Sequence, residues 1–312
     1  MGKLLFIRGG AVGDFILTLP AIELVRTALP DPEIEILGYP SISELAVAAG
    51  LADRTRSIEM AKLAPFFAPG AELDAEMCEY FAGFDVVVSY LYDPDGYFQG
   101  NLERAGVDTL ISGPFRMAED GPETPAPEQL AAPLSRLALF LEKPWIEVSY
   151  GEPVADEEGP VIAIHPGSGS PSKNWSLEGW AALADKIAGE IPDVSFRIIS
   201  GEAEGETIGD FLEKLEASGL RYIHEGEMSL VEVGRCLHGC DLFLGHDSGI
   251  SHLAASTGVP GLIFFGPSNP GVWAPQHPRF DFIQAPGGQL GNLSSDMIFN
   301  DDLFRGKIAE LK

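Results

Sequence analysis

Three short loops of this 312-residue chain combine residue types that suit catalysis or anion binding. The first, Arg8-Gly9-Gly10-Ala11-Val12-Gly13-Asp14, joins three glycines to one carboxylate. Glycine lets a backbone turn tightly and come close to a ligand. Asp14 could take part in chemistry at this loop or simply be the N-cap of the following helix.

The second loop, residues 165–175, has the sequence His-Pro-Gly-Ser-Gly-Ser-Pro-Ser-Lys-Asn-Trp. Its amides and hydroxyls, those of Ser168 and Gly169 among them, could hold phosphate oxygens, and Lys173 would supply a compact positive charge. The alternative is an ordinary loop with a solvated lysine, because Gly and Ser mark loops in general.

The third loop, residues 245–252, has the sequence Gly-His-Asp-Ser-Gly-Ile-Ser-His and leads into an expected helix. The first amides of a helix carry a partial positive charge, which makes them a natural site for a diphosphate. Asp247 or Ser248 could equally be a plain helix cap.

Short apolar runs alternate with helical patterns, and this order places each of the three loops between a strand and a helix. The first half predicts strands and helices as follows: strands Leu4–Ile7, Ile34–Leu37 and Phe84–Ser89, and helices Phe15–Ala28, Ile42–Ala49 and Gln129–Leu141. This is the pattern of a parallel sheet covered by helices on both faces.

The second half repeats the alternation after an acidic segment, Glu147–Pro160, which shows no period and predicts a linker. Its expected elements are strands Val161–Ile164, Ser195–Ile199, Tyr222–His224, Asp241–Leu244 and Leu262–Phe265, and helices Leu177–Ala188, Thr207–Ala217, Leu230–Leu237 and Gly249–Thr257. A second doubly wound sheet follows. The stretch Ser294–Leu311 predicts a closing helix, which could return to pack on the first domain. We therefore expect domains at 1–150 and 151–312.

The composition predicts a globular protein with an acidic surface. Hydrophobic residues make up 45% and charged residues 21% of the chain, and the net charge is −27. Ten basic residues oppose 23 acidic ones up to residue 150, and ten oppose 24 after it. Neither half favours a nucleic acid partner or an anionic membrane, where contact would be peripheral at most.

The start of the chain and its cysteines both favour the cytoplasm. The apolar run before Arg8 is too short for a signal peptide or a membrane span, and three cysteines suit a reducing compartment better than a disulfide framework.

Two patterns with other meanings have better explanations. Asp93-Pro94-Asp95 spells a metal-binding D-x-D, but Asp-Pro and the following Gly96 favour a turn with a helix cap. Cys236, His238 and Cys240 lie close together but lack a fourth ligand for structural zinc, and buried cysteines at a helix end are the better interpretation. We expect no metal and no cofactor.

Taken together, the motifs resemble those of glycosyltransferase family 9, the ADP-heptose:lipopolysaccharide heptosyltransferases. The resemblance rests on Asp-Ser-Gly-x-x-His-Leu-Ala-Ala at 247–255, on Phe-Gly-Pro-Ser-Asn-Pro at 265–270, on the lysine loop, and on Arg8 with Asp14 ahead of Leu17-Thr18-Leu19-Pro20-Ala21. It spans both halves in order.

This resemblance implies an α/β protein of the GT-B type, with two Rossmann-like domains facing across a cleft. It implies an inverting, metal-independent transfer of a sugar, heptose from ADP-heptose, onto a hydroxyl of lipopolysaccharide or a related glycan. Asp14 would be the base, and Lys173 would stabilise the leaving diphosphate. The acceptor-side loop would hold Arg8, Gly10 and Gly13, and the donor would meet Ser168, Gly169, Met228, Asp247, Ser248, Gly249 and His252.

Several assignments stay open. Glu204 and Glu206 both fit the carboxylate expected at the ribose. Basic residues for an anionic acceptor are scarce, so the acceptor and the sugar are not fixed by sequence. A nucleotide-sugar-binding protein without turnover, or a transferase for another sugar nucleotide, is the alternative. A nicotinamide or flavin oxidoreductase is disfavoured, because the glycines do not form G-x-G-x-x-G.

Overall fold

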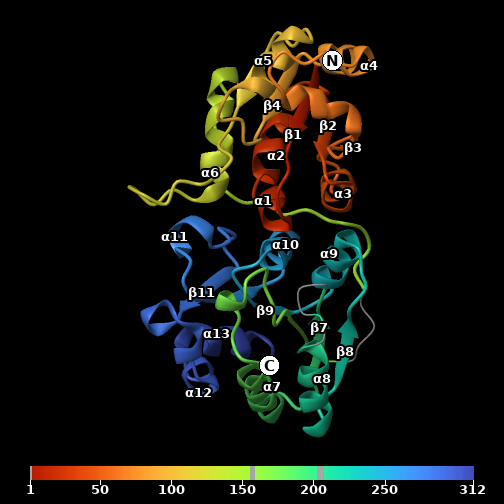
Figure 1. Cartoon of the computed structure of the whole chain (residues 1–312). Helices are drawn as coiled ribbons and strands as arrows, with labels where there is room; N and C mark the ends of the chain where they lie inside the picture. The colour runs from red at the N-terminus through yellow and green to blue at the C-terminus, as the bar shows by residue number, and fades with distance from the viewer. Residues whose placement is uncertain (1, 155–158, 202–204, 206) are drawn as a thin grey trace. The chain divides into compact units, whose positions relative to one another are not determined.

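The computed structural model describes residues 2–154, 159–201, 205 and 207–312, and the chain divides into two compact units, Met1–Ile146 and Glu147–Lys312 (Figure 1). Both consist of a parallel β-sheet with helices on its two faces, which confirms the α/β class expected from the alternating pattern.

The first unit has a five-stranded sheet in the order β3-β2-β1-β4-β5. Its strands are β1 (Lys3–Ile7), β2 (Glu33–Gly38), β3 (Arg54–Ser57), β4 (Val86–Ser89) and β5 (Leu110–Ser112). Its helices are α1 (Val12–Ile16), α2 (Leu19–Ala28), α3 (Pro40–Ala48), α4 (Ala75–Ala82), α5 (Tyr97–Arg104) and α6 (Ala126–Ala131), with 3-10 turns η1 (Ala61–Phe67) and η2 (Ala132–Leu137).

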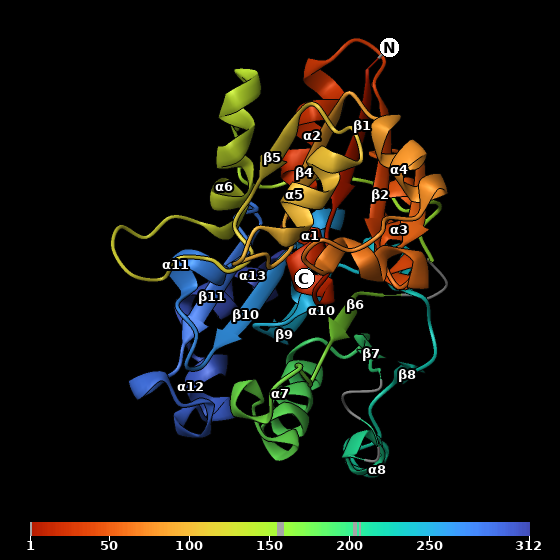
Figure 2. The same ribbon diagram turned by 45° about the horizontal axis from the view of Figure 1, so that its top comes forward.

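The apolar strand β1 lies at the centre of this sheet because its side chains are buried on both faces. Leu5 and Ile7 join a core built with α4, α5 and η1. Side chains alternate along a strand, so Leu4 and Phe6 point to the other face. There α2 and α6 lie side by side (Figures 1 and 2).

The single helix predicted over Phe15–Ala28 is wrong in one respect, because it is two helices, α1 and α2. Pro20 stands in the first turn of α2. Proline has no N–H, and its ring would clash with the carbonyl of residue i−4, here Ile16, in a continuous helix. The break at Leu17 and Thr18 separates the short α1 from α2, and the Thr18 hydroxyl donates to the Asp14 carbonyl at 2.9 Å.

The second unit has a six-stranded sheet in the order β11-β10-β9-β6-β7-β8. Its strands are β6 (Val161–Ile164), β7 (Ser195–Ile199), β8 (Tyr222–Glu225), β9 (Leu242–His246), β10 (Gly261–Phe265) and β11 (Phe280–Gln284). Its helices are α7 (Leu177–Glu190), α8 (Thr207–Ala217), α9 (Leu230–His238), α10 (Gly249–Thr257), α11 (Pro270–Trp273), α12 (Ser295–Phe299) and α13 (Asp302–Glu310), with 3-10 turns η3 (Pro171–Lys173), η4 (Pro286–Gly288) and η5 (Leu290–Asn292).

One face of this sheet holds a large core around Trp180, which is fully buried among side chains of α7, α8 and the central strands. The predicted closing helix is two helices, because the Asp301 carboxylate caps a new helix at the Leu303 amide. Ile298, Phe304 and Ile308 of these helices belong to the core of the second unit. The possible return of this segment to the first domain is not what these core residues do.

In both sheets the strand order reverses beside the first strand, between β1 and β4 and between β6 and β9. We call these two places the switch points. Ligands of doubly wound sheets bind at the carboxyl ends of the strands at such a point. All three loops with candidate chemistry begin there.

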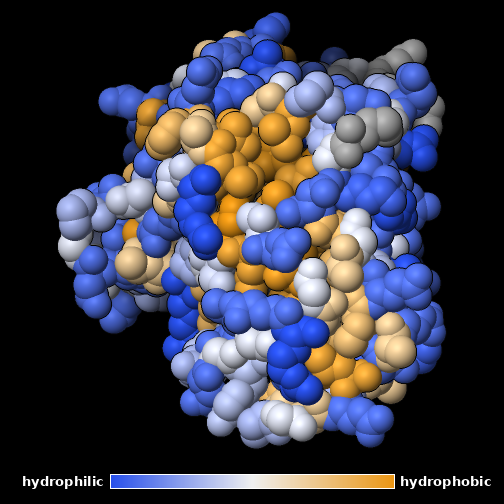
Figure 3. Space-filling view, turned by 90° about the horizontal axis from the view of Figure 1, so that it is seen from above, coloured by the Kyte–Doolittle hydropathy of each residue, from blue (hydrophilic) through white to orange (hydrophobic). Residues whose placement is uncertain are grey.

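No helix within the described part of the chain combines the length and the apolar character needed to cross a membrane. The face seen in Figure 3 shows a central band of hydrophobic side chains bordered by hydrophilic ones.

Candidate active site

At the switch point of the second unit, Lys173 and Asp247 form an ion pair. The Lys173 Nζ donates to Asp247 Oδ2 at 2.6 Å, although the two residues are 74 positions apart in sequence. Lys173 ends the turn after β6, and Asp247 directly follows β9, which pairs with β6. The Asp247 side chain is 8% exposed and that of Lys173 35% exposed. The lysine therefore keeps a solvent-facing part while it neutralises a buried carboxylate.

The lysine loop is held in place by buried contacts that the sequence motif does not reveal. The backbone amide of Trp175 donates to His246 Nε2 at 2.9 Å, and its indole Nε1 donates to the Leu293 carbonyl at 3.0 Å. The Ser168 hydroxyl lies 2.6 Å from Asn174 Oδ1. Burial lowers the pKa of His246 to about 3, with a further contribution from His165, so the ring is neutral and can accept this bond at ordinary pH.

The N-terminus of α10 forms the other side of this switch point. Ser248 is its N-cap, and the Ser248 hydroxyl accepts a bond from the Ser251 amide. Gly249 is the first helical residue. Among the described residues of this helix no acidic side chain occupies the first turn. No carboxylate of the helix itself therefore neutralises the partial positive charge of its N-terminus, which directly follows Asp247 in the chain. His252 is buried one turn into the helix.

The remaining residues predicted to bind the donor differ in their exposure, and two of them lie outside the described residues. Gly169 is exposed in the lysine loop, and Met228 is half-buried immediately before Ser229, the N-cap of α9. Glu204 and Glu206, the two candidates for the ribose, lie outside the described residues.

At the switch point of the first unit, Asp14 is fixed by Arg8 and by its own helix. Arg8 Nη2 lies 3.3 Å from Asp14 Oδ1, and the Ala11 amide donates to Asp14 Oδ2 at 2.9 Å. The N-cap role considered for Asp14 is wrong, because Ala11 is the N-cap and Asp14 is the third helical residue. Its side chain is 38% exposed, so the carboxylate remains open to a substrate.

Arg8 is the buried support of this carboxylate. It is 3% exposed, and its guanidinium lies 5.6 Å from the centroid of the Tyr90 ring. Burial lowers the pKa of Arg8, whereas the Asp14 carboxylate and Tyr90 raise it. The arginine thus depends on Asp14 for much of its compensation in a desolvated position.

Of the three glycines in this loop, Gly10 is the one whose conformation requires glycine. Its φ is +100°, and a Cβ there would lie 2.7 Å from Asp14 Oδ2. Gly13 lies within α1. Because Gly10 has no Cβ, the Asp14 carboxylate can lie against it and accept the bond from the Ala11 amide at the start of α1.

The structure explains the two patterns that were set aside. Asp93 accepts bonds from the amides of Phe98 at 3.1 Å and Gln99 at 2.9 Å, which confirms a helix cap, here for α5. Cys236 and Cys240 are buried at the end of α9, and Arg197 Nη1 lies 3.3 Å from the Cys236 sulfur. Within the described ranges, no group of three His, Cys, Asp or Glu residues is arranged to hold a metal ion.

Sequence reasoning found the loops but missed some of the residues that position them. His246 stood inside the third motif without an assigned role, and Asn174 inside the second. His246 ends the buried strand β9 and Asn174 directly follows the turn η3, and such a position alone does not identify a hydrogen-bond partner. The Arg8 to Asp14 pair was signalled by the presence of opposite charges in one short loop.

Comparison with known proteins supports the same family. Residues 138–294 match the sequence profile of glycosyltransferase family 9 (heptosyltransferase). Lipopolysaccharide heptosyltransferase 1 of Escherichia coli O18:K1:H7 (strain RS218 / NMEC) is 28% identical over 127 residues, 40% of this chain and 37% of the relative. The chain thus aligns with well under half the length of this curated relative.

Two solved structures share the fold over nearly the whole chain. A family 9 glycosyl transferase from Veillonella parvula has a TM-score of 0.77 at 16% identity, covering 99% of this chain and 97% of the other. An E. coli heptosyltransferase solved with ADP has a TM-score of 0.73 at 18% identity, covering 99% of this chain and 100% of the other. This likeness confirms the GT-B fold. The family profile covers half of the chain, and the chain belongs to glycosyltransferase family 9.

Proposed function

We propose that this protein is an inverting glycosyltransferase that moves a sugar, heptose from ADP-heptose, onto a hydroxyl of lipopolysaccharide or a related glycan. The observation that carries the proposal is the complementary chemistry of the two switch points. One presents an accessible carboxylate, Asp14, and the other presents a lysine beside a helix N-terminus. Transfer from a sugar diphosphate needs both, a base for the nucleophile and positive charge for the leaving group.

The proposed reaction is a single displacement. Asp14 takes the proton of the acceptor hydroxyl while the oxygen attacks the anomeric carbon, and the bond from that carbon to the diphosphate oxygen breaks. The electron pair of this bond leaves with the nucleotide diphosphate. Lys173 and the amides of Ser248 and Gly249 would stabilise the growing charge there, a stronger effect in a desolvated site than in water.

Arg8 would serve the base by orienting it. It contacts one carboxylate oxygen of Asp14, and the Ala11 amide contacts the other. Both contacts fix the direction of the exposed edge of the carboxylate.

We further propose that the reaction needs no metal. Lys173 and α10 would replace the cation that other glycosyltransferases place on the diphosphate, and Asp93 is engaged as a helix cap. Transfer that persists at the parental rate after dialysis against a chelator supports this. Transfer that is lost on chelation and restored by one divalent ion would contradict it.

The cytoplasm is the proposed location. The three cysteines are free thiols in the structure, as is usual in a reducing compartment, and cytoplasmic nucleotide sugars would be at hand. Any membrane contact through a glycolipid acceptor would be peripheral.

The decisive test is the variant Asp14→Asn, which keeps an oxygen for the Ala11 amide but removes the base. We expect turnover to fall by about a hundredfold to ten-thousandfold, the usual contribution of a general base. Binding of ADP, measured by calorimetry, should stay unchanged. Asp108→Asn replaces an exposed carboxylate of the same unit and should keep full activity.

A nucleotide-sugar-binding protein without turnover is the alternative, and ligand-dependent stability separates the two. Thermal shift with ADP, UDP and NAD identifies the nucleotide, because a ligand that binds the folded state raises its apparent stability. Release of ADP from ADP-heptose only in the presence of an acceptor supports the transferase. If the protein binds ADP-heptose but releases no ADP with any acceptor tested, the alternative of a binding protein without turnover would be correct.

A further inference from the structure

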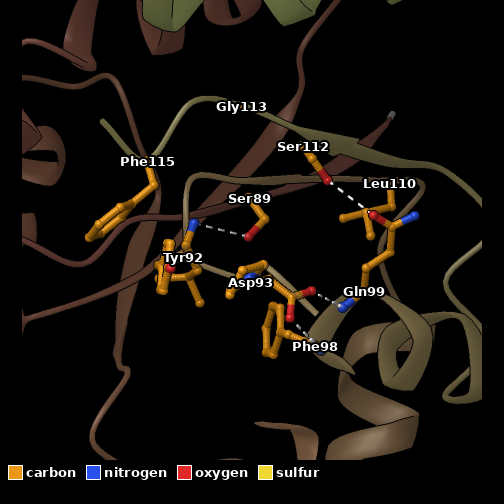
Figure 4. Close-up of a pocket in the computed structure, with 11 residues that line it drawn as sticks. Ser89, Tyr92, Asp93, Phe98, Gln99, Leu110, Ser112, Gly113 and Phe115 are labelled. Atoms are coloured by element: carbon orange, nitrogen blue, oxygen red, sulfur yellow. Dashed lines mark hydrogen bonds between the residues drawn. The ribbon is translucent and has the colours of Figure 1, made fainter. Parts of the chain in front are cut away.

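The first unit contains a pocket of about 280 Å³ at the carboxyl ends of β4 and β5 (Figure 4). Small-molecule sites range over roughly 300 to 1,000 Å³, so this pocket suits a single sugar ring. Its lining residues are Ser89, Leu91, Tyr92, Asp93, Pro94, Phe98, Gln99, Leu110, Ser112, Gly113 and Phe115.

An aromatic pair forms one side of the pocket. Tyr92 and Phe115 have ring centroids 5.2 Å apart, and they are 65% and 42% exposed. Figure 4 shows the two rings together on one side, with Gln99 and Ser112 on the other. Both rings therefore keep apolar surface open to a ligand at the pocket. Their faces match the apolar C–H face of a sugar ring.

The polar side of the pocket offers groups that a sugar's hydroxyls can engage. The Ser112 hydroxyl lies 3.5 Å from Gln99 Oε1, and the Ser89 hydroxyl accepts from the Leu91 amide at 3.4 Å. Both bonds are long and therefore weak. A ligand hydroxyl can replace or supplement them at small cost.

The pocket lies beside the beginning of the loop that carries Asp14 in the same unit. Ile7, which ends β1, pairs with Ser89, and a Cβ on Gly9 would contact the Leu91 side chain at 3.7 Å. Arg8 also reaches the Tyr90 carbonyl at 3.5 Å. The start of the loop that carries Asp14 therefore touches the segment of residues 89–91 on the pocket side of β4.

The charge of the pocket is the feature that selects among sugars. Its lining residues, all within the described part of the chain, include Asp93 but no lysine or arginine. Arg116 lies outside the lining with its guanidinium 5.9 Å from the Phe115 ring centroid. The Asp93 carboxylate already accepts bonds from the Phe98 and Gln99 amides. An anionic ring would lie near this carboxylate with no lysine or arginine in the lining to pair with, and an uncharged ring would meet no such repulsion.

We propose that this pocket binds one uncharged sugar ring of the acceptor, stacked on Tyr92 and Phe115, and that it selects against sugar acids. The inference rests on the proposed transferase function, since it names the class of acceptor that Asp14 would deprotonate.

The test compares methyl β-glucoside with methyl β-glucuronide, two rings that differ by one carboxylate, in ligand-detected NMR titrations of the full-length protein. We expect the glucoside to bind more tightly than the glucuronide at low salt. Tyr92→Ala and Phe115→Ala should each weaken glucoside binding by about three- to tenfold, the loss expected for one aromatic contact. Phe140→Ala removes a 69% exposed ring elsewhere in the first unit and should change nothing.

Two results would overturn the inference. The first is glucuronide binding that equals or exceeds glucoside binding and is lost in Arg116→Ala, which would make the site anion-selective. The second is binding of neither glycoside by a protein that binds ADP, which would leave the donor proposal standing. Glucoside binding without ADP binding would keep the pocket as a sugar site and reject the transferase.

Discussion

Lys173 and Asp247 show how one contact can serve both stability and function. Their pair is partly buried, so removing the lysine leaves a carboxylate that is 8% exposed without its partner. Loss of one member of a buried pair costs more than the pair contributes, because the remaining charge stays desolvated. The same lysine is the proposed counter-charge for the donor, which makes the two effects separable only by a double variant.

We expect Lys173→Met to lower the free energy of unfolding by about 1–2 kcal/mol, less than for a fully buried pair because the lysine is 35% exposed. It should also weaken ADP binding. Lys173→Met with Asp247→Asn should regain stability in a urea titration but not ADP affinity. A double variant that regains both would mean that the lysine acts on the donor only through the fold.

His246 gives the second unit a dependence of stability on pH. Its folded-state pKa of about 3 lies below the ordinary 6.5, because the ring is fully buried. As pH falls below 6.5 the unfolded chain binds a proton at this histidine that the folded chain does not bind. The free energy of unfolding therefore falls between pH 6.5 and 3, by about 2 kcal/mol at pH 5.

The variant His246→Gln tests this, since its side-chain oxygen can accept the Trp175 amide bond without titrating. Urea titrations from pH 7.5 to 5 should show a shallower loss of stability than in the parent protein. His238→Gln, at the exposed end of α9, should keep the parental slope. An unchanged slope in His246→Gln would assign the acid sensitivity to other groups.

Among the elements, the buried strands were the easiest to predict from sequence. Runs such as Val161–Ile164 are buried along their whole length, so their hydrophobic residues alone identify them. The edge strand β3, with the sequence Arg-Thr-Arg-Ser, was missed because its support comes from another strand. Arg54 and Arg56 pair with Glu35 of β2, a buried carboxylate, and no local pattern contains that information.

The candidate site was likewise predictable in its local sequence patterns but not in its contacts between distant segments. Each loop was identified by its place between a strand and a helix, but its partners depend on strand order. The Lys173 to Asp247 pair and the Trp175 to His246 bond both exist because β6 and β9 are neighbours. Sequence alone does not fix that adjacency.

The loop from β1 to α1 gives a prediction that concerns backbone shape. Gly10→Ala places a Cβ 2.7 Å from Asp14 Oδ2 at a φ of +100°, so either the loop or the carboxylate must move. We expect a loss of about 1–2 kcal/mol in unfolding free energy and a tenfold or larger loss of turnover. Gly189→Ala, in α7 where the added carbon meets nothing within 4 Å, should instead stabilise by up to about 1 kcal/mol. Full activity in Gly10→Ala would show that the position of Asp14 tolerates this shift.

For the molecule as a whole, the net charge of −27 opposes the approach of its own proposed donor. A nucleotide diphosphate is an anion, and the acidic excess is divided almost evenly between the two halves of the chain. At about 10 mM salt the Debye length is roughly 30 Å, so this repulsion acts over the whole protein. The attraction to Lys173 and to α10 acts at contact distance and is screened less, because it is partly buried.

The long-range repulsion and the short-range attraction together predict that donor association becomes faster as salt is added. We expect the association rate constant of a fluorescent ADP analogue, measured by stopped flow, to rise several-fold between about 10 and 150 mM salt, while its dissociation rate changes little. Lys173→Met should retain the rise in the association rate, because the effect originates in the distributed charge. An association rate that falls with salt would mean that local positive charge dominates the field met by the approaching donor. The long-range repulsion inferred from the net charge would then be wrong.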